Sequence, residues 1–128
     1  NLAKLIKDQT KEPGKDYLII DVRDEDFKSG HIPGAINIPS HTMADEVNNL
    51  IDTYRQVPQI FFHCALSQRR GPSSARVYSE TLSQKSTETS QKVQILRGGF
   101  VLWQEKYKDD PELIADYDKD VWEQMVYY

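Results

Sequence analysis

Three short apolar runs, each followed by a stretch with helical pattern, most constrain how this chain can fold. The runs cover residues 17–20, 60–62 and 93–96, the last of which is interrupted by Gln94. Such short runs are typical of strands that are buried on both faces of a sheet. The helical stretches cover residues 43–54, 72–82 and 100–107. Strands that alternate with helices form parallel sheets covered on both sides, so the sequence predicts an α/β fold with a central parallel sheet flanked by helices.

The size of the chain predicts one domain over residues 1–128. With 128 residues, of which 38% are hydrophobic, a second core would leave too few residues for either. No run approaches the ~18 apolar residues of a membrane span, and the N-terminal part lacks the layout of a secretory signal. We therefore expect an intracellular protein, in the cytoplasm, the nucleus or both, that does not bind a membrane.

The chain has one cysteine, Cys64, which excludes an internal disulfide and a multi-cysteine metal site. The net charge of −4 argues against a nucleic-acid partner, which needs a basic face. Charge is nevertheless unevenly distributed, since no acidic residue lies between Asp52 and Glu80. This acid-free window contains Cys64 and His63 as well as four arginines: Arg55, Arg69, Arg70 and Arg76.

The second apolar run ends in His63 and Cys64, and five residues later Arg70 precedes Gly71-Pro72, which opens a helix. Ligands of parallel sheets bind at such junctions, where strands end and helices begin. The helix N-terminus and the arginine favour the thiolate of Cys64. Inward-pointing amides of the loop and the fork of Arg70 would hold three oxygens of a tetrahedral oxyanion. The predicted oxyanion loop comprises Ala65, Leu66, Ser67, Gln68 and Arg69.

The predicted catalytic residues are therefore Cys64, as the nucleophile, and Arg70. Attack on phosphorus would give a phosphocysteine that water hydrolyses, and the same cradle would serve attack on arsenic or on a sulfane sulfur. We expect His63 and Gly71 to support the loop, with His63 orienting it by hydrogen bonding in preference to stabilising the thiolate. Ser67 has two open roles: it hydrogen-bonds the thiolate or satisfies the loop backbone.

The segment His63-Cys64-x5-Arg70-Gly71-Pro72 resembles the active-site loop of one branch of the rhodanese superfamily. That branch contains the cell-division-cycle dual-specificity phosphatases and the eukaryotic arsenate reductases. Residues 21–23 (Asp-Val-Arg) with 30–35 (Gly-His-Ile-Pro-Gly-Ala) resemble the superfamily's N-terminal signature, and residues 97–100 (Arg-Gly-Gly-Phe) with Trp103 resemble the C-terminal one. The resemblance implies a rhodanese-like, three-layer domain over nearly the whole chain.

Loop length separates functions within the superfamily. Sulfurtransferases of this fold have a loop shorter by one residue, whereas the seven residues from Cys64 to Arg70 form a wider cradle that suits phosphate or arsenate. Arg69 would also close the shorter loop, so the assignment depends on Gly71-Pro72 fixing Arg70 as the closing residue. The cell-cycle phosphatases carry a glutamate at the position of Arg69. Because no acid lies within the loop, aryl phosphates are favoured over substrates with poor leaving groups.

The leading prediction is a cysteine-dependent phosphatase for phosphotyrosine and other aryl phosphates, with dual specificity left open, no cofactor and no metal. The alternative is an arsenate reductase, in which glutathione and glutaredoxin must regenerate Cys64. A thiosulfate sulfurtransferase and a non-catalytic phospho-binding module rank lower. The expected partner is a phosphorylated substrate or a small oxyanion, and the sequence leaves the oligomeric state undetermined.

The two flanking signatures have a predicted structural role. Asp21 and Arg23 are expected to pair with each other or with His31, and not to act in catalysis. Gly98 and Gly99 are expected to allow close packing against the loop.

Overall fold

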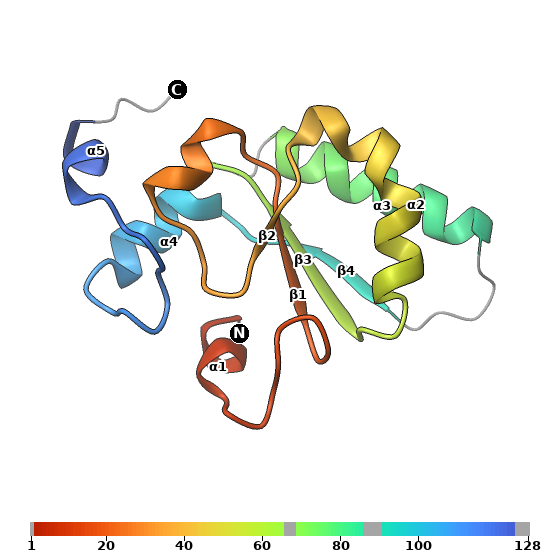
Figure 1. Ribbon diagram of the computed structural model, residues 1–128, viewed down its shortest axis with the longest axis horizontal. Coiled ribbons are helices and arrows are strands. Elements are labelled where there is room, and N and C mark those ends of the chain that lie inside the picture. Colours follow the sequence, from red (N-terminus) through yellow and green to blue (C-terminus); the bar gives the residue numbers. More distant parts are fainter. Residues whose placement is uncertain (1, 66–68, 86–90, 125–128) are drawn as a thin grey trace.

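A computed structural model of the protein describes residues 2–65, 69–85 and 91–124 (Figure 1). The α-helices are α1 (Leu2–Lys7), α2 (Met43–Tyr54), α3 (Arg70–Lys85), α4 (Gly99–Tyr107) and α5 (Lys119–Gln124). The strands are β1 (Leu18–Asp21), β2 (Ile36–Asn37), β3 (Gln59–His63) and β4 (Lys92–Ile95). Two short 3-10 helices, η1 (Glu25–Ser29) and η2 (Ser40–Thr42), lie between β1 and α2.

The four strands form one sheet in the order β2-β1-β3-β4, and every pairing is parallel. In the register, Ile20 lies opposite Phe62, and Phe62 lies opposite Ile95. All four strands therefore end at the same edge of the sheet, where the segments after β1, β3 and β4 meet. The predicted parallel sheet is confirmed.

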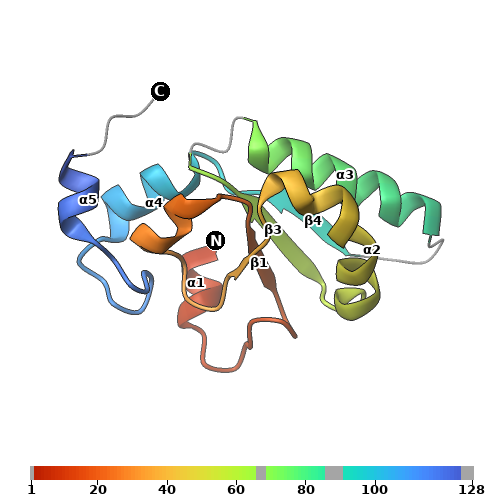
Figure 2. The ribbon, with the colours of Figure 1, turned by 45° about the horizontal axis from the view of Figure 1, so that its top comes forward.

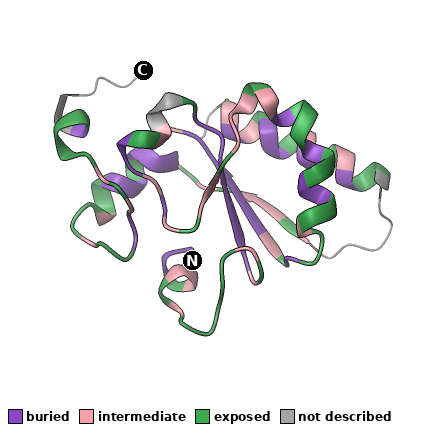
Figure 3. Ribbon diagram, in the orientation of Figure 1, coloured by how far each residue is buried: buried purple, intermediate pink, exposed green. Residues whose placement is uncertain are grey.

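Helices cover both faces of this sheet (Figures 1 and 2). Ile20 and Phe62 point to the side of α2 and α3 and join the core cluster there. Ile19 and Phe61 alternate with them and join a second cluster with α1 and α4. Burial is accordingly greatest along the central strands and on the inner sides of the helices (Figure 3). Period-two alternation with apolar residues on both faces explains why these strands read as continuous apolar runs.

The third helix is longer than the sequence predicts. The apolar pattern ends at Leu82, which is buried, whereas α3 continues to Lys85. Ser83 and Gln84 are exposed, so this last turn carries no hydrophobic signal. Backbone hydrogen bonding can extend a helix past its last buried residue without leaving such a signal.

The segment after α4 packs against the domain through its aromatic residues. The Trp122 indole N–H donates to the Ser29 carbonyl at 3.0 Å, and the Tyr117 hydroxyl donates to the Gln104 side chain at 2.8 Å. These contacts attach the C-terminal segment to η1 and to α4. None of the helices in the described part of the chain has both the length and the apolar character needed to cross a membrane.

Candidate active site

Cys64 directly follows β3, at the edge of the sheet where the parallel strands end. Its side chain is only 4% exposed and belongs to the core cluster on the side of α2 and α3. Arg70, which is half-buried, is the first residue of α3. The structure thus places Cys64 and Arg70 at the two ends of one strand-to-helix junction. Of the residues between them, Leu66, Ser67 and Gln68 lie outside the described residues, Ala65 is half-buried and Arg69 is exposed.

Gly71 allows α3 to begin directly against the end of β3. A methyl group at this buried glycine would lie 3.3 Å from the His63 Cα and 3.4 Å from the Cys64 nitrogen. These distances are tighter than most contacts of a real Cβ. The predicted supporting role of Gly71 therefore has a structural basis, since a larger residue would move the N-terminus of α3 away from Cys64.

The first turn of α4 holds the beginning of the loop by its backbone. The Phe100 N–H donates to the Cys64 carbonyl at 3.0 Å, and the Val101 N–H donates to the Ala65 carbonyl at 2.9 Å. A trans peptide directs its N–H opposite to its C=O, so the Ala65 N–H points away from α4. Because the two carbonyls are satisfied by a neighbouring helix, the peptide that follows Cys64 can present its amide to a ligand.

Gly98 and Gly99 make this approach possible. Both have left-handed backbone conformations, with φ of 77° and 59°. A methyl group at Gly99 would overlap the carbonyl oxygens of Cys64 and Ala65 and would lie 2.7 Å from the Ala65 carbonyl carbon. The structure therefore supports the predicted close packing against the loop for Gly99, whereas a methyl group at Gly98 would first meet the side chain of Leu102.

His63 lies beneath the loop and is fully buried. Its Nδ1 lies 3.2 Å from the Cys64 carbonyl oxygen, within hydrogen-bonding distance. Its Nε2 lies 3.7 Å from Oδ2 of Asp21, which is also fully buried. These contacts favour the predicted orienting role for His63, since the ring faces the Cys64 backbone on one side and a carboxylate on the other.

Asp21 forms a buried ion pair with Arg23 behind this histidine. The guanidinium donates through Nε and Nη2 to both carboxylate oxygens, and the shortest distance, from Nη2 to Oδ2, is 2.7 Å. Nη2 also donates to the Gly30 carbonyl, and the guanidinium carbon lies 4.3 Å from the centroid of the Phe100 ring. The Asp21–Arg23 pair therefore connects the end of β1 to the helix that holds the loop.

His31 was the other predicted partner of Asp21 and Arg23, but it contacts a different part of the chain. Its ring stacks on Phe27 with centroids 4.2 Å apart, and its Nε2 lies 3.9 Å from a carboxylate oxygen of Asp116. Its backbone pairs with Ala115 in an isolated antiparallel bridge. His31 thus helps to attach the C-terminal segment and does not belong to the loop.

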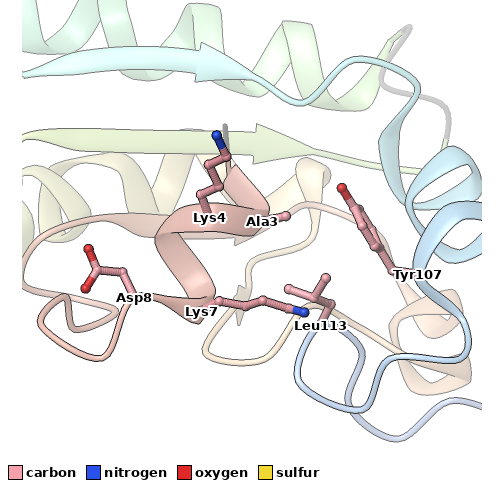
Figure 4. A pocket seen from close by; sticks show the side chains of 6 residues that line it. All are labelled: Ala3, Lys4, Lys7, Asp8, Tyr107 and Leu113. Atoms are coloured by element: carbon pink, nitrogen blue, oxygen red, sulfur yellow. The ribbon is translucent and has the colours of Figure 1, made fainter.

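Two surface hollows of about 400 Å³ each lie elsewhere, around α1. One is lined by Ala3, Lys4, Lys7, Asp8, Tyr107 and Leu113 (Figure 4). The Lys7 ammonium there lies 2.7 Å from a carboxylate oxygen of Asp110. Neither hollow is lined by a residue of the loop or of the first turn of α4. We place the candidate site at the loop, because amides and an arginine, rather than a large cavity, hold a small oxyanion.

Sequence reasoning missed the amides of Phe100 and Val101. Backbone donors leave no side-chain signature, and the only available signal was the Gly98-Gly99 pair before an apolar segment. Metal ligands are a separate question: within the described residues, no cluster of three or more His, Cys, Asp or Glu side chains could hold a metal ion.

The fold and the loop define a class of protein: an α/β domain with a cysteine-to-arginine loop between a parallel strand and a helix. The chain belongs to the rhodanese family, since residues 2–106 match its rhodanese-like domain. This finding confirms the family and the fold class predicted from the sequence.

The named relatives include dual specificity phosphatases and arsenate reductases. The dual specificity phosphatase ibp1 of Schizosaccharomyces pombe is 36% identical over 128 residues, covering 88% of this chain and 92% of that protein. Arsenate reductase 2.1 of Oryza sativa subsp. japonica is 38% identical over 88 residues, covering 67% of this chain and 55% of that protein. Both of the leading functions predicted from the sequence are thus found among named relatives.

Solved structures agree with these sequence relatives. Ygr203w, a yeast protein tyrosine phosphatase of the rhodanese family, superposes with a TM-score of 0.76 and 29% sequence identity. The superposition covers 94% of this chain and 91% of that chain. The prediction of a phosphatase-type enzyme, with arsenate reductase as the alternative, is therefore confirmed at the level of its relatives.

Proposed function

We propose that this protein is a cysteine-dependent phosphatase that hydrolyses aryl phosphates, including phosphotyrosine. Cys64 is the nucleophile, and Arg70 with the loop amides binds the phosphoryl oxygens. The observation that carries the proposal is the pair of hydrogen bonds from the Phe100 and Val101 amides to the Cys64 and Ala65 carbonyls. These bonds fix the start of the loop with its carbonyls turned away from the place where an oxyanion would bind.

In the first step the Cys64 thiolate attacks phosphorus and forms an S–P bond, while the bond from phosphorus to the aryl oxygen breaks. The aryl oxygen leaves with the electron pair. The guanidinium of Arg70, at the other end of the loop, donates in parallel to two non-bridging oxygens and holds the planar phosphoryl group, over whose three equatorial oxygens the charge is spread in the transition state. Water then attacks phosphorus, breaks the S–P bond and releases inorganic phosphate together with the thiolate.

The substrate class follows from the absence of an acid in the loop. Residues 64–70 contain no Asp or Glu, so the loop cannot protonate a leaving group. Phenolates leave without full protonation more easily than the alkoxides of serine or threonine. Phosphotyrosine and other aryl phosphates are therefore the preferred substrates, and dual specificity would require an acid from outside the loop.

Arsenate reduction is the second candidate, because two of the relatives are named arsenate reductases. The same cradle accepts arsenate, and the thiolate would form a bond to arsenic. Since Cys64 is the only cysteine in the sequence, external thiols such as glutathione with glutaredoxin must supply the reducing electrons and regenerate the thiol. The phosphatase reaction needs no such co-reactant.

The test compares three substrates side by side: p-nitrophenyl phosphate, arsenate with glutathione and glutaredoxin, and thiosulfate with cyanide. We expect hydrolysis of the aryl phosphate with competitive inhibition by vanadate, and no turnover in Cys64→Ser. Arg70→Lys keeps the charge but loses the fork, so kcat should fall about 10²-fold. Arg55→Lys, at an exposed arginine after α2, is the matched control and should leave kcat unchanged. Hydrolysis that survives Cys64→Ser would exclude the covalent mechanism.

A further inference from the structure

Arg97 lies in the turn between β4 and α4, and the proposed chemistry does not use it. The Leu96 N–H donates to the Phe62 carbonyl at 3.0 Å, which continues the β3–β4 pairing beyond Ile95. Arg97 directly follows Leu96, in the turn closed by the hydrogen bond from the Gly99 N–H to the Leu96 carbonyl. The chain then turns through the two glycines into α4, whose first amides bond to the Cys64 and Ala65 carbonyls. The backbone of Arg97 is thus held on both sides.

The charge of Arg97 is not neutralised within the described part of the chain. Two other arginines there form ion pairs, Arg23 with Asp21 and Arg76 with Glu80. Arg97 is exposed and takes part in no ion pair among the described residues, and the same holds for Arg69 at the far end of the loop. Two exposed arginines therefore lie close to the loop along the chain: Arg69 directly before α3 and Arg97 in the turn between β4 and α4.

An exposed aliphatic side chain adjoins this cation. Leu102 is 51% exposed, and it lies over Gly98, because a methyl group there would be 2.9 Å from the Leu102 Cβ. Leu102 is one of three large hydrophobic residues that are exposed in the described chain, with Ile95 and Val121. A cation beside an aliphatic surface is suited to a peptide that carries both acidic and apolar groups.

We propose that Arg97 binds an acidic side chain of a phosphorylated peptide substrate, while Leu102 contacts aliphatic atoms of the same peptide. This inference rests on the proposed phosphatase function and specifies its substrate class. An inorganic oxyanion fits between Cys64 and Arg70 and needs no group at Arg97, whereas a peptide extends beyond the loop. An extended chain advances about 3.3 Å per residue, so acids one to three residues from the phosphotyrosine sample about 3–10 Å of peptide on either side of it.

The test uses two phosphotyrosyl peptides, one with aspartates flanking the phosphotyrosine and one with asparagines at the same positions. We measure kcat and KM for the wild type, for Arg97→Gln and for Arg55→Gln, which removes an exposed arginine near the start of β3, at the opposite edge of the sheet. Peptide binding is also measured by fluorescence anisotropy in the Cys64→Ser background, where no turnover is needed.

We expect the wild type to have a KM about three- to fivefold lower for the acidic peptide, as an exposed ion pair allows. Arg97→Gln should abolish this difference, and Arg55→Gln should keep it. Turnover of p-nitrophenyl phosphate should be equal in all three proteins. High salt should reduce the wild-type preference, since exposed charges are screened.

The outcomes separate this inference from the proposed function. The role of Arg97 is wrong if Arg97→Gln still has a lower KM for the acidic peptide than for the asparagine peptide. It is also wrong if Arg55→Gln loses this difference to the same extent. If no phosphate ester is hydrolysed but Cys64→Ser binds the acidic peptide through Arg97, the catalytic proposal fails and the recognition site stands. If Arg97→Gln lowers glutaredoxin-dependent arsenate reduction without changing peptide binding, Arg97 contacts a redox partner and the peptide proposal is wrong.

Discussion

Substituting Gly99 by alanine should both destabilise the protein and damage the loop. The added methyl group would lie 2.7 Å from the Ala65 carbonyl carbon, about 1 Å less than an ordinary carbon–carbon contact. Relief requires α4 and the loop to separate, which breaks the bonds from the Phe100 and Val101 amides, each contributing about 1 kcal/mol. The left-handed backbone, with φ of 59°, costs alanine about another 1 kcal/mol. We therefore expect a loss of about 3 kcal/mol in the free energy of unfolding.

Activity should fall further than stability alone explains. Moving the Cys64 peptide by about 1 Å misplaces the nucleophile and its amide, which can lower the rate roughly 10²-fold. Urea unfolding and kcat/KM for p-nitrophenyl phosphate measure the two effects.

Gly14→Ala is the matched control for the backbone cost. Gly14 has a left-handed φ of 85°, but a methyl group there would meet only Tyr54, at 3.9 Å. It should lose about 1 kcal/mol and keep full activity. If Gly99→Ala kept wild-type stability and kcat/KM, or if Gly14→Ala lost as much activity, the proposed support of the loop by α4 would be refuted.

Two further predictions concern buried polar groups. Arg23→Leu leaves the buried Asp21 carboxylate without its arginine partner, so we expect a loss of about 3–5 kcal/mol in the free energy of unfolding, measured in urea. The Asp21→Leu/Arg23→Leu double variant removes both charges and should lose less. Equal losses in the two variants would contradict the idea that the unpaired buried carboxylate causes the destabilisation. Burial raises the pKa of Tyr78 from 10.0 to about 12. The buried neutral hydroxyl therefore makes its full contribution to the free energy of unfolding below pH 10, and this contribution is lost as the pH rises to about 12. Tyr78→Phe should flatten that decline and, by losing the bond to Gln91, lower stability at pH 8 by about 1 kcal/mol. If the free energy of unfolding fell equally steeply between pH 10 and 12 in the wild type and in Tyr78→Phe, the raised pKa of Tyr78 would be contradicted.

The sequence predicted the parts of the fold that depend on burial. The apolar run at 60–62 identified β3, and the Gly71-Pro72 pair identified the start of α3. Helix α2 was predicted with its observed bounds, because its buried residues repeat at helical spacing from Met43 to the last turn. The end of α3 was missed for the opposite reason, since its last turn buries nothing.

Some parts of the candidate site could likewise be predicted from the sequence, and others could not. Cys64 and Arg70 could be proposed as site residues from the sequence alone, because their residue types and spacing suit the binding and attack of an oxyanion. The contacts that orient the loop could not, because they are made by backbone amides of α4. Two partners were open for Arg23, and only tertiary structure decides between them: Arg23 is buried against Asp21 and Phe100, while His31 stacks on Phe27.

The local charge of the site differs from the charge of the whole chain. The net charge is −4, yet Arg69, Arg70 and Arg97 lie at or beside the loop. The acidic C-terminal segment does not lie far from this region, because the ring of Trp122 packs on that of Phe100 with centroids 5.5 Å apart. What favours an anion is the composition around the loop, since residues 53–79 contain no Asp or Glu. Charges nearer than the Debye length of about 8 Å act most strongly on a bound ligand at physiological ionic strength, so a negatively charged substrate is compatible with an acidic protein.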